Sequence, residues 1–321
     1  MKISVVYSTD ENYVRYCATS ILSLLENSTD IGKIYIIDNK IKIESKKKLN
    51  DMISRFNVNI VYIPIDSIVY DLEKNNDFSI SSYARLLMQR EIVEDKIIYI
   101  DCDTIVVDNI AKLWNINIED YWVAGVQDAL PKILKKKVGL KKEDRYINAG
   151  VLLINLKKWK EENLDKRYIN FVNEHKGNVV HHDQGLINGV CKNKIYILPP
   201  EYNFMSEMTY YTAKQLKKLY SEKNYYTQKE LDNAKSLPVI IHFISKFYKR
   251  PWIEGSTNPY TTLFLQYMKR TGFDTKLLKD IPNKKVELRK KMYKKLPFFL
   301  YMCFEKMLDF KRNIVIIIKY R

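Results

Sequence analysis

The stretch that decides the fold is Ile97-Ile-Tyr-Ile-Asp101-Cys-Asp103-Thr-Ile-Val-Val-Asp108. An apolar run of this kind predicts a buried strand, and side chains alternate along a strand with period two. Asp101 and Asp103 are therefore expected on one side. Two carboxylates so close repel each other unless a divalent cation offsets their charge, and that cation could also bridge a diphosphate. A polar turn at the end of a strand is the alternative interpretation.

Strand and helix patterns alternate on both sides of this stretch. Strands are predicted over residues 2–8, 33–37, 59–64, 96–107, 122–126, 150–155, 195–198 and 239–242, and helices over 11–26, 42–56, 81–93, 156–173 and 182–191. This βαβ rhythm predicts an α/β fold with a mostly parallel sheet flanked by helices.

The glycine pattern excludes two common nucleotide-binding loops. The chain has nine glycines, and the closest two are Gly185 and Gly189. Neither G-x-G-x-x-G nor G-x-x-x-x-G-K-[ST] can occur with this spacing, so a Rossmann dinucleotide loop and a P-loop are excluded in their usual form. A bound phosphate must be held by side chains or by a metal.

The charge of the chain is concentrated at one end. The 321 residues carry a net charge of +16, and residues 284–321 contribute +9 of it, interleaved with Phe298, Phe299, Tyr301 and Phe304. This composition is typical of an amphipathic helix on an anionic membrane surface, and a C-terminal helix packed on the main domain is the alternative. A nucleic-acid partner is not expected, because the chain has no recognition helix or RNA-binding aromatic signature.

Cysteine spacing and the N-terminus indicate the compartment. The four cysteines form no C-x-x-C pair, and no signal-peptide pattern precedes the first strand. A cytoplasmic protein with reduced thiols is therefore expected.

Further motifs follow in one order along the chain. They are Tyr7-Ser-Thr-Asp-Glu-Asn-Tyr13, Ser82-Tyr-Ala-Arg85-Leu, Asn148-Ala-Gly150, His182-Asp183-Gln184, Leu198-Pro-Pro-Glu-Tyr-Asn203-Phe and Ile240-Ile-His242-Phe. Together with Asp101-Cys-Asp103, they resemble glycosyltransferase family 8, which includes bacterial lipopolysaccharide α-galactosyl- and α-glucosyltransferases and glycogenin. The resemblance covers residues 1–270. It implies a GT-A fold with a Rossmann-like nucleotide-sugar half, in a catalytic domain over 1–283. The composition described above predicts that a basic membrane-association segment follows over 284–321.

The resemblance also implies a metal site. Asp101, Asp103 and His242 would hold Mn²⁺, with Mg²⁺ as the alternative, against the diphosphate of a UDP-sugar. Arg85 would add a fixed cation beside the sugar and phosphate. From the residues alone, His242 would be read as a core histidine at the end of a strand, and the alternative for Arg85 is a solvated arginine on a helix.

Other family positions would contact the nucleoside and the sugar. Those implied for the uridine are Ser8, Asp10, Asn12 and Tyr13, and those implied for the donor sugar are Asp128, Asn148, Asp183 and Gln184. Asp10 is also a candidate helix cap, and the two roles are compatible. The family retains the anomeric configuration of the sugar. Because Gln184 is a poor nucleophile, attack on the face that UDP leaves is favoured over a double displacement.

One segment departs from the family pattern, in which glycine and lysine after the histidine contact the diphosphate. Here His242 is followed by Phe-Ile-Ser-Lys246-Phe-Tyr-Lys249-Arg250-Pro-Trp252, two residues longer and without the glycine. The phosphate cation could be Lys246, Lys249 or Arg250. Lys249 is favoured, because Arg250 stands directly before the proline.

The expected function is that of a retaining, metal-dependent hexosyltransferase. It would move a hexose from UDP-glucose or UDP-galactose to a saccharide acceptor such as lipopolysaccharide core or a glycolipid, at the inner face of the cell membrane. The alternative is a sugar nucleotidyltransferase, which also uses paired aspartates and a metal but releases pyrophosphate.

Overall fold

The computed structural model describes residues 2–70, 83–244 and 247–319, without the side chains of residues 132, 285 and 309–319. The strands are β1 (Ile3–Asp10), β2 (Ile31–Asn39), β3 (Asn59–Pro64), β4 (Lys96–Ile100), β5 (Thr104–Val106), β6 (Val123–Gln127), β7 (Ile147–Asn155), β8 (Ile195–Leu198), β9 (Phe204–Met205) and β10 (Ile240–His242). The α-helices are α1 (Val14–Asn27), α2 (Ile43–Ile53), α3 (Ile65–Ile68), α5 (Ala111–Trp114), α6 (Lys132–Lys137), α7 (Leu156–Glu161), α8 (Leu164–Glu174), α9 (His182–Val190), α10 (Ala213–Tyr220), α11 (Gln228–Ser236), α12 (Thr261–Met268), α13 (Lys284–Lys295) and α14 (Phe298–Lys319). Short 3₁₀ helices are η1 (Met88–Arg90), η2 (Pro200–Asn203) and η3 (Ser206–Thr209).

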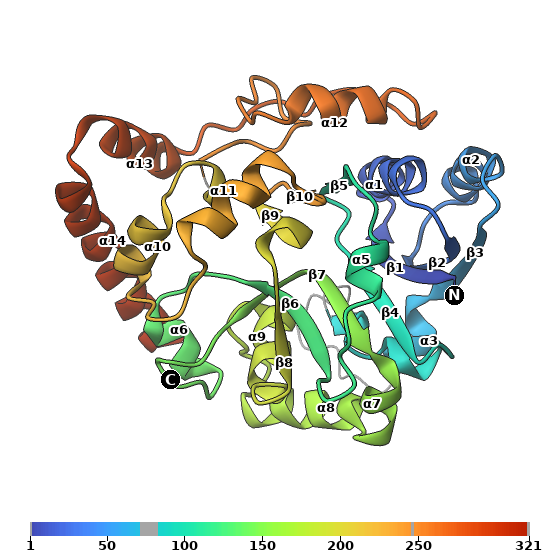
Figure 1. The fold of residues 1–321 in the computed structure, drawn as a ribbon, viewed down its shortest axis with the longest axis horizontal. Helices are drawn as coiled ribbons and strands as arrows, with labels where there is room; N and C mark the ends of the chain where they lie inside the picture. The colour runs from blue at the N-terminus through green and yellow to red at the C-terminus, as the bar shows by residue number, and fades with distance from the viewer. Residues whose placement is uncertain (1, 71–82, 245–246, 320–321) are drawn as a thin grey trace.

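A seven-stranded sheet runs through the centre of the molecule in the order β3-β2-β1-β4-β7-β6-β8 (Figure 1). β7 is antiparallel to both of its neighbours, and the other paired strands of this sheet are parallel. A smaller sheet has the order β5-β10-β9. The mixed, mostly parallel arrangement confirms the predicted fold class.

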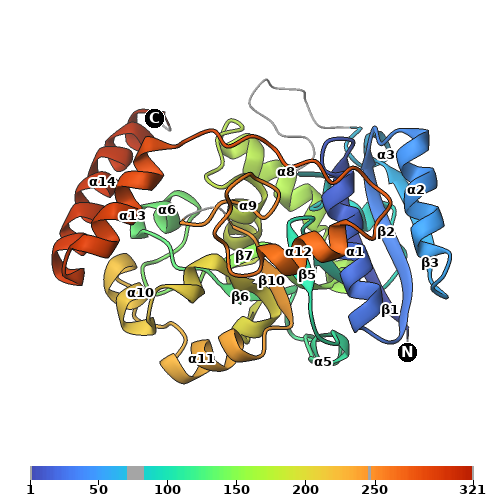
Figure 2. The ribbon, with the colours of Figure 1, turned by 90° about the horizontal axis from the view of Figure 1, so that it is seen from above.

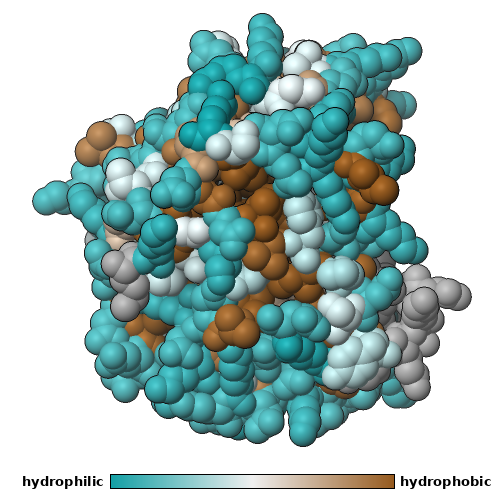
Figure 3. Space-filling view, turned by 90° about the vertical axis from the view of Figure 1, so that its right-hand side faces the viewer, coloured by the Kyte–Doolittle hydropathy of each residue, from teal (hydrophilic) through white to brown (hydrophobic). Residues whose placement is uncertain are grey.

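Helices cover both faces of the large sheet, because successive strand residues face opposite ways. Val5 of β1 packs in a core with Ile21 of α1, whereas the next residue, Val6, packs in a second core with Trp159 of α7 and Leu186 of α9. Figure 1 shows α1 and α2 on one side of the sheet and α7, α8 and α9 on the other. On the side that carries β3 and α2, hydrophilic side chains cover most of the surface around a central apolar strip (Figure 3).

Two predicted helices differ from the observed ones. The helix expected over 156–173 is divided into α7 and α8, because Asn163 adopts a left-handed conformation with φ of 53°. The helix expected over 81–93 begins at residues that lie outside the described part. In the described part, Tyr83 and Ala84 are helical, and the segment then continues in turns and the short helix η1. Its residues from Tyr83 to Met88 are mostly buried, so the one-sided apolar pattern of a surface helix does not apply to them.

The C-terminal helices pack on the main body of the protein. Both views place α13 and α14 at one end of the molecule, beside α10 and α6 (Figures 1 and 2). Tyr301 of α14 is fully buried and exchanges a hydrogen bond of 2.7 Å with the hydroxyl of Tyr211. Within the residues described, no helix has the length and apolar character needed to cross a membrane.

Candidate active site

The end of β4 brings Asp101 and Asp103 opposite His242. After β4 the chain turns through residues 101–103 into β5, and the Asp101 amide donates to the Gly150 carbonyl at 2.7 Å. The Thr104 hydroxyl closes the same turn by donating to the Asp101 carbonyl at 2.8 Å. Antiparallel pairing of β5 with β10 then places Thr104 beside His242. The two aspartates lie in a turn rather than inside a strand.

These three side chains form a compact donor set. The His242 Nε2 atom lies 3.2 Å from Asp103 Oδ1 and 3.9 Å from Asp101 Oδ2. One ligand atom from each of the three residues lies within 4.8 Å of the others. Two carboxylate oxygens and one imidazole nitrogen suit Mn²⁺ and accept Mg²⁺. The structure thus brings the predicted metal ligands together, and they fit a divalent cation.

Two guanidinium groups balance the aspartates. Arg85 Nη1 lies 2.9 Å from Asp101 Oδ1, and Arg250 Nη2 lies 2.8 Å from Asp103 Oδ2. Burial alone would raise the pKa of Asp103, but the facing His242 and Arg250 outweigh it and hold this pKa at about 2. Asp103 is therefore a carboxylate at neutral pH. Burial lowers the pKa of His242, and the charges of Asp103 and Asp101 raise it above its usual value.

Arg85 connects the metal donor set to the sugar-pocket residues. Its Nε lies 3.3 Å from Asp183 Oδ2, and its guanidinium lies over the ring of Tyr99 at 4.3 Å from the ring centre. Burial raises the pKa of Asp183 above its usual value. The charge of Arg85 lowers this pKa, but it offsets only part of the rise. The Arg85 side chain is only 14% exposed, so it is not the solvated arginine of the alternative interpretation.

Three of the four residues predicted to face the donor sugar form one hydrogen-bonded cluster, and the fourth, Asp183, pairs with Arg85. Asn148 Nδ2 donates to Gln184 Oε1 at 3.1 Å and to Asp128 Oδ2 at 3.5 Å, and Gln184 Nε2 donates to the same Asp128 oxygen at 3.3 Å. The Ala149 amide also donates to Gln184 Oε1, at 3.2 Å. Residues from β7 and α9 therefore converge with Asp128, which directly follows β6.

The predicted uridine residues lie at the end of β1. Asp10 Oδ1 accepts the backbone N–H groups of Asn12 and Tyr13, both at 2.9 Å, so its carboxylate shapes the loop before α1. The Tyr13 hydroxyl accepts from Arg250 Nη1 at 2.8 Å, which connects this loop to the metal donor set. Ser8 is half-buried, and Asn12 is exposed.

The three candidate phosphate cations are not equivalent. Lys246 lies outside the described residues. Lys249 Nζ pairs with Asp280 at 2.7 Å, whereas Arg250 reaches Asp103 and Tyr13. Of the two described candidates, only Arg250 contacts the metal donor set.

Two residues at the site were not assigned from the sequence. The Tyr99 hydroxyl donates to Asp101 Oδ1 at 2.7 Å, and Asn203 Oδ1 lies 2.9 Å from His242 Nδ1. Tyr99 stands two residues before Asp101, a spacing that would have placed it on the same side of the strand. Asn203 belongs to a quoted motif, but no local pattern signals its contact with a residue 39 positions away.

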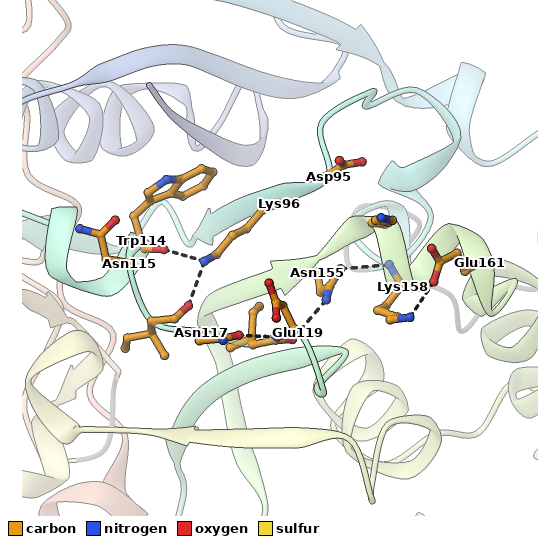
Figure 4. A pocket seen from close by; sticks show the side chains of 12 residues that line it. Asp95, Lys96, Trp114, Asn115, Asn117, Glu119, Asn155, Lys158 and Glu161 are labelled. Atoms are coloured by element: carbon orange, nitrogen blue, oxygen red, sulfur yellow. Dashed lines mark hydrogen bonds and ion pairs between the residues drawn. The ribbon is translucent and has the colours of Figure 1, made fainter. Parts of the chain in front are cut away.

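A hollow of about 580 Å³ lies elsewhere, beside the first residue of β4 (Figure 4). Lys96 Nζ donates there to the backbone carbonyls of Trp114 and Ile116 at 2.6 and 2.9 Å, and Lys158 pairs with Glu161. Both ammonium groups are thus bonded within the protein. This hollow is at the opposite end of β4 from Asp101 and contains none of the predicted site residues.

The chain matches the model of the family described as "Glycosyl transferase family 8" over residues 4–255. It is 30% identical to General stress protein A of Bacillus subtilis over 84% of this chain and 94% of that protein. It is 23% identical to Lipopolysaccharide 1,3-galactosyltransferase of Salmonella typhimurium over 83% of this chain and 77% of that protein.

Among solved structures, the fold is similar to that of the galactosyltransferase LgtC in complex with donor and acceptor sugar analogs. The TM-score is 0.69 at 23% identity, over 90% of this chain and all of that one. The architecture is therefore the GT-A fold, as predicted. The family match, the curated relatives and the convergence of the sequence motifs lead to one conclusion: the chain is a glycosyltransferase and belongs to glycosyltransferase family 8.

Proposed function

We propose that this glycosyltransferase is a retaining, metal-dependent hexosyltransferase that moves glucose or galactose from a UDP-sugar to a saccharide acceptor such as lipopolysaccharide core or a glycolipid. The observation that carries the proposal is the position of Arg85, which pairs with Asp101 of the metal donor set and Asp183 of the sugar pocket. A nucleotide sugar has its diphosphate next to its hexose, and these two clusters match that order. The galactosyltransferase named among the relatives supports a hexose donor.

Different residues of the site would bind different parts of the UDP-sugar donor. A divalent cation held by Asp101, Asp103 and His242 would neutralise the diphosphate and stabilise the departing UDP. Tyr13 would stack on the uracil, with Ser8, Asp10 and Asn12 beside the nucleoside. Arg250, in place of Lys249, would supply the side-chain cation at the diphosphate, because a guanidinium binds phosphate oxygens in a two-pronged geometry.

The sugar cluster supports a front-side reaction. Gln184 and Asp128 hold each other by hydrogen bonds and would orient the hexose hydroxyls. An amide is a poor nucleophile, so a covalent sugar–Gln184 intermediate is not proposed. The acceptor hydroxyl attacks the anomeric carbon on the face that UDP leaves, and the departing phosphate oxygen takes the hydroxyl proton. The new glycosidic bond keeps the anomeric configuration.

The test is a panel of UDP-sugars assayed with Mn²⁺, with and without saccharide acceptors. Release of UDP and an α-linked product are expected from α-linked UDP-glucose or UDP-galactose. Release of pyrophosphate would instead indicate a nucleotidyltransferase, and a β-linked product would contradict retention. Asp103→Asn should lower turnover by about 10²-fold or more, because a neutral amide replaces a negatively charged ligand of the metal. Full turnover by this variant would contradict the metal assignment.

We also propose that the segment over 284–321 holds the enzyme on an anionic membrane, at the cytoplasmic face where its acceptor is exposed. Lys291, Lys294 and Lys295 are exposed, and so are the apolar side chains of Phe299 and Leu300. Exposed basic and apolar side chains in neighbouring segments are typical of peripheral membrane helices. Binding to vesicles that contain anionic lipid should fall in a Lys294→Glu, Lys295→Glu variant and in Phe299→Ser. Unchanged binding by both would contradict the proposal.

A further inference from the structure

The amide of Asn203 lies between the metal donor set and the sugar cluster. Asn203 is the last residue of η2 and is fully buried. Its Oδ1 lies 2.9 Å from His242 Nδ1, and its Nδ2 lies 2.8 Å from Asn148 Oδ1. One side chain thus contacts both a predicted metal ligand and a sugar-pocket residue.

Backbone groups fix the direction of this hydrogen-bond chain. The Gly150 N–H can only donate, and it donates to Asn148 at 2.9 Å, so the Asn148 atom that it meets is the carbonyl oxygen. The Asn203 atom that faces this same oxygen must then be the NH₂ group, which leaves the Asn203 carbonyl facing His242. His242 Nδ1 must therefore carry a proton and donate.

The orientation of the imidazole follows. With the proton on Nδ1, the lone pair of the neutral ring is on Nε2, which faces Asp101 and Asp103. Gly150 confines the ring at Cε1, the carbon between the two nitrogens, since a Cβ there would lie 2.1 Å from this atom. The histidine is thereby presented to a cation in one tautomer and one position.

The same chain extends to the sugar cluster. Asn148 uses its NH₂ group to donate to Gln184 Oε1, and the Ala149 N–H donates to that same oxygen. Gln184 is then left with its NH₂ group toward Asp128. Two adjacent backbone amides of β7 thus define the direction of every side-chain hydrogen bond between His242 and Asp128.

We propose that Asn203 is a positioning residue that holds His242 in the Nδ1–H tautomer for metal binding and couples this ligand to the Gln184 cluster. The inference rests on the proposed metal-dependent function. Outer-shell partners that orient a ligating histidine change metal affinity by about 10- to 100-fold when they are removed. Asn203→Ala should therefore weaken Mn²⁺ binding by about that factor.

Two readouts test the proposal on the 321-residue chain. The first is the tautomer of His242 in metal-free protein with ¹⁵N-labelled histidine, measured from ¹H–¹⁵N ring correlations at a pH where the ring is neutral. The second is a Mn²⁺ titration. In Asn203→Ala, the Nδ1–H preference should be lost and the titration should shift to higher Mn²⁺.

Asn203→Asp separates the two halves of the role. The carboxylate still accepts from His242 Nδ1, but it cannot donate to Asn148. The tautomer and the Mn²⁺ affinity should stay near those of the wild type, while kcat for transfer falls. This variant also keeps the proposal testable if Asn203→Ala does not fold.

Asn155→Ala is the matched control. Asn155 is the last residue of β7, at the end of the strand away from Asn148. Its NH₂ group donates to the Ile118 carbonyl, and its side-chain oxygen caps α7. It should lose stability without any change in tautomer or Mn²⁺ affinity. A wild-type tautomer and affinity in Asn203→Ala would overturn the positioning role, and an unchanged kcat in Asn203→Asp would overturn the coupling. If wild-type protein binds no Mn²⁺, the proposed function fails, whereas the tautomer measurement still tests the contact.

Discussion

At the scale of single residues, the site is a balance of three carboxylates against two guanidinium groups. Arg85 pairs with Asp101 and Asp183, and Arg250 pairs with Asp103. An aspartate is costly to bury as an unpaired charge, so each arginine offsets the charge of the carboxylate that it contacts. For Asp103, Arg250 and His242 lower the pKa and keep the group ionised.

Arg250 should matter more for donor binding than its neighbour Lys249. Arg250→Ala is expected to raise the KM for the UDP-sugar by about 10- to 100-fold, the usual effect of losing a hydrogen bond to a charged group. Lys249→Ala, which removes only the pair with Asp280, is the matched control. Steady-state kinetics of the two variants decide the assignment, and the reverse order of effects would restore Lys249 as the phosphate cation.

Much of the site could be predicted residue by residue. The carboxylates of Asp101 and Asp103 follow directly from their spacing after an apolar strand, and the family motifs added His242, Asn148 and Gln184. The choice between Lys249 and Arg250 could not be predicted, because adjacent residues point in different directions and only the folded segment defines which one faces Asp103.

At the scale of elements, the pattern of apolar residues predicted most strands well, since β3 and β8 match the expected ranges and most others differ by a few residues. The strand expected over 96–107 is divided into β4 and β5, which belong to different sheets, and β9 was not expected. Helix breaks were harder to predict. The left-handed Asn163 between α7 and α8 interrupts a continuous helical pattern, because the packing of each helix on the sheet overrides local propensity.

A partly buried ion pair ties β2 to the turn before β4 and should respond to acid. Burial raises the pKa of Glu94, but Lys33, at 2.7 Å, and Tyr35 outweigh it and lower this pKa below the usual 4.5. Its stabilising contribution is therefore present above pH 4.5 and lost as the pH falls below that value. Glu94→Gln should lower the free energy of unfolding by about 1 kcal/mol at neutral pH and by less in acid.

Denaturant unfolding at several pH values measures this difference. Glu161→Gln is the control, because Glu161 belongs to an exposed pair with Lys158. A Glu94→Gln effect that is the same at every pH would contradict the prediction.

A fully buried ion pair joins α6 to the residue that follows the turn after α10. The side chains of Lys135 and Glu222 are 1% and 5% exposed, and Lys135 Nζ also donates to the Asp144 carbonyl at 2.8 Å. Lys135→Met should cost about 3–5 kcal/mol, because it leaves a carboxylate buried without its partner.

The double variant Lys135→Met, Glu222→Leu should recover much of that loss, since no unpaired charge remains. Thermal and denaturant unfolding of the single and double variants form the cycle. Lys158→Ala, at the exposed pair, should cost less than about 1 kcal/mol. A double variant no more stable than Lys135→Met would show that packing, rather than the unpaired charge, explains the loss.

At the scale of the whole molecule, the C-terminal helices are structural as well as basic. Tyr293 and Tyr301 pack against Tyr211. The ring centre of Phe247 lies 4.4 Å from that of Tyr210 and 5.4 Å from that of Tyr293. Phe247 stands three residues before Arg250. The docked helices therefore support the segment that carries a residue of the site.

Removal of residues 284–321 should consequently do more than release the protein from vesicles. It is expected to lower the thermal unfolding midpoint and the rate of transfer to a soluble acceptor, because it uncovers this aromatic cluster. The Lys294→Glu, Lys295→Glu variant should leave both quantities unchanged. Full activity of the truncated chain on a soluble acceptor would contradict a supporting role for α13 and α14.

The sequence by itself determined the α/β class, the family, the metal-ligand candidates and the concentration of charge at one end. These depend on local periodicity, on motifs of a few residues and on composition, all of which are present before the chain folds. Only the tertiary structure decided that Arg250 meets Asp103, 147 positions away, and that Asn203 orients His242. It also decided that Tyr293 and Tyr301, near the end of the sequence, pack against Tyr211 of the main body. Such contacts join distant segments, and their geometry arises from the pairing of β5 with β10 and from helix packing, neither of which any short stretch of sequence contains.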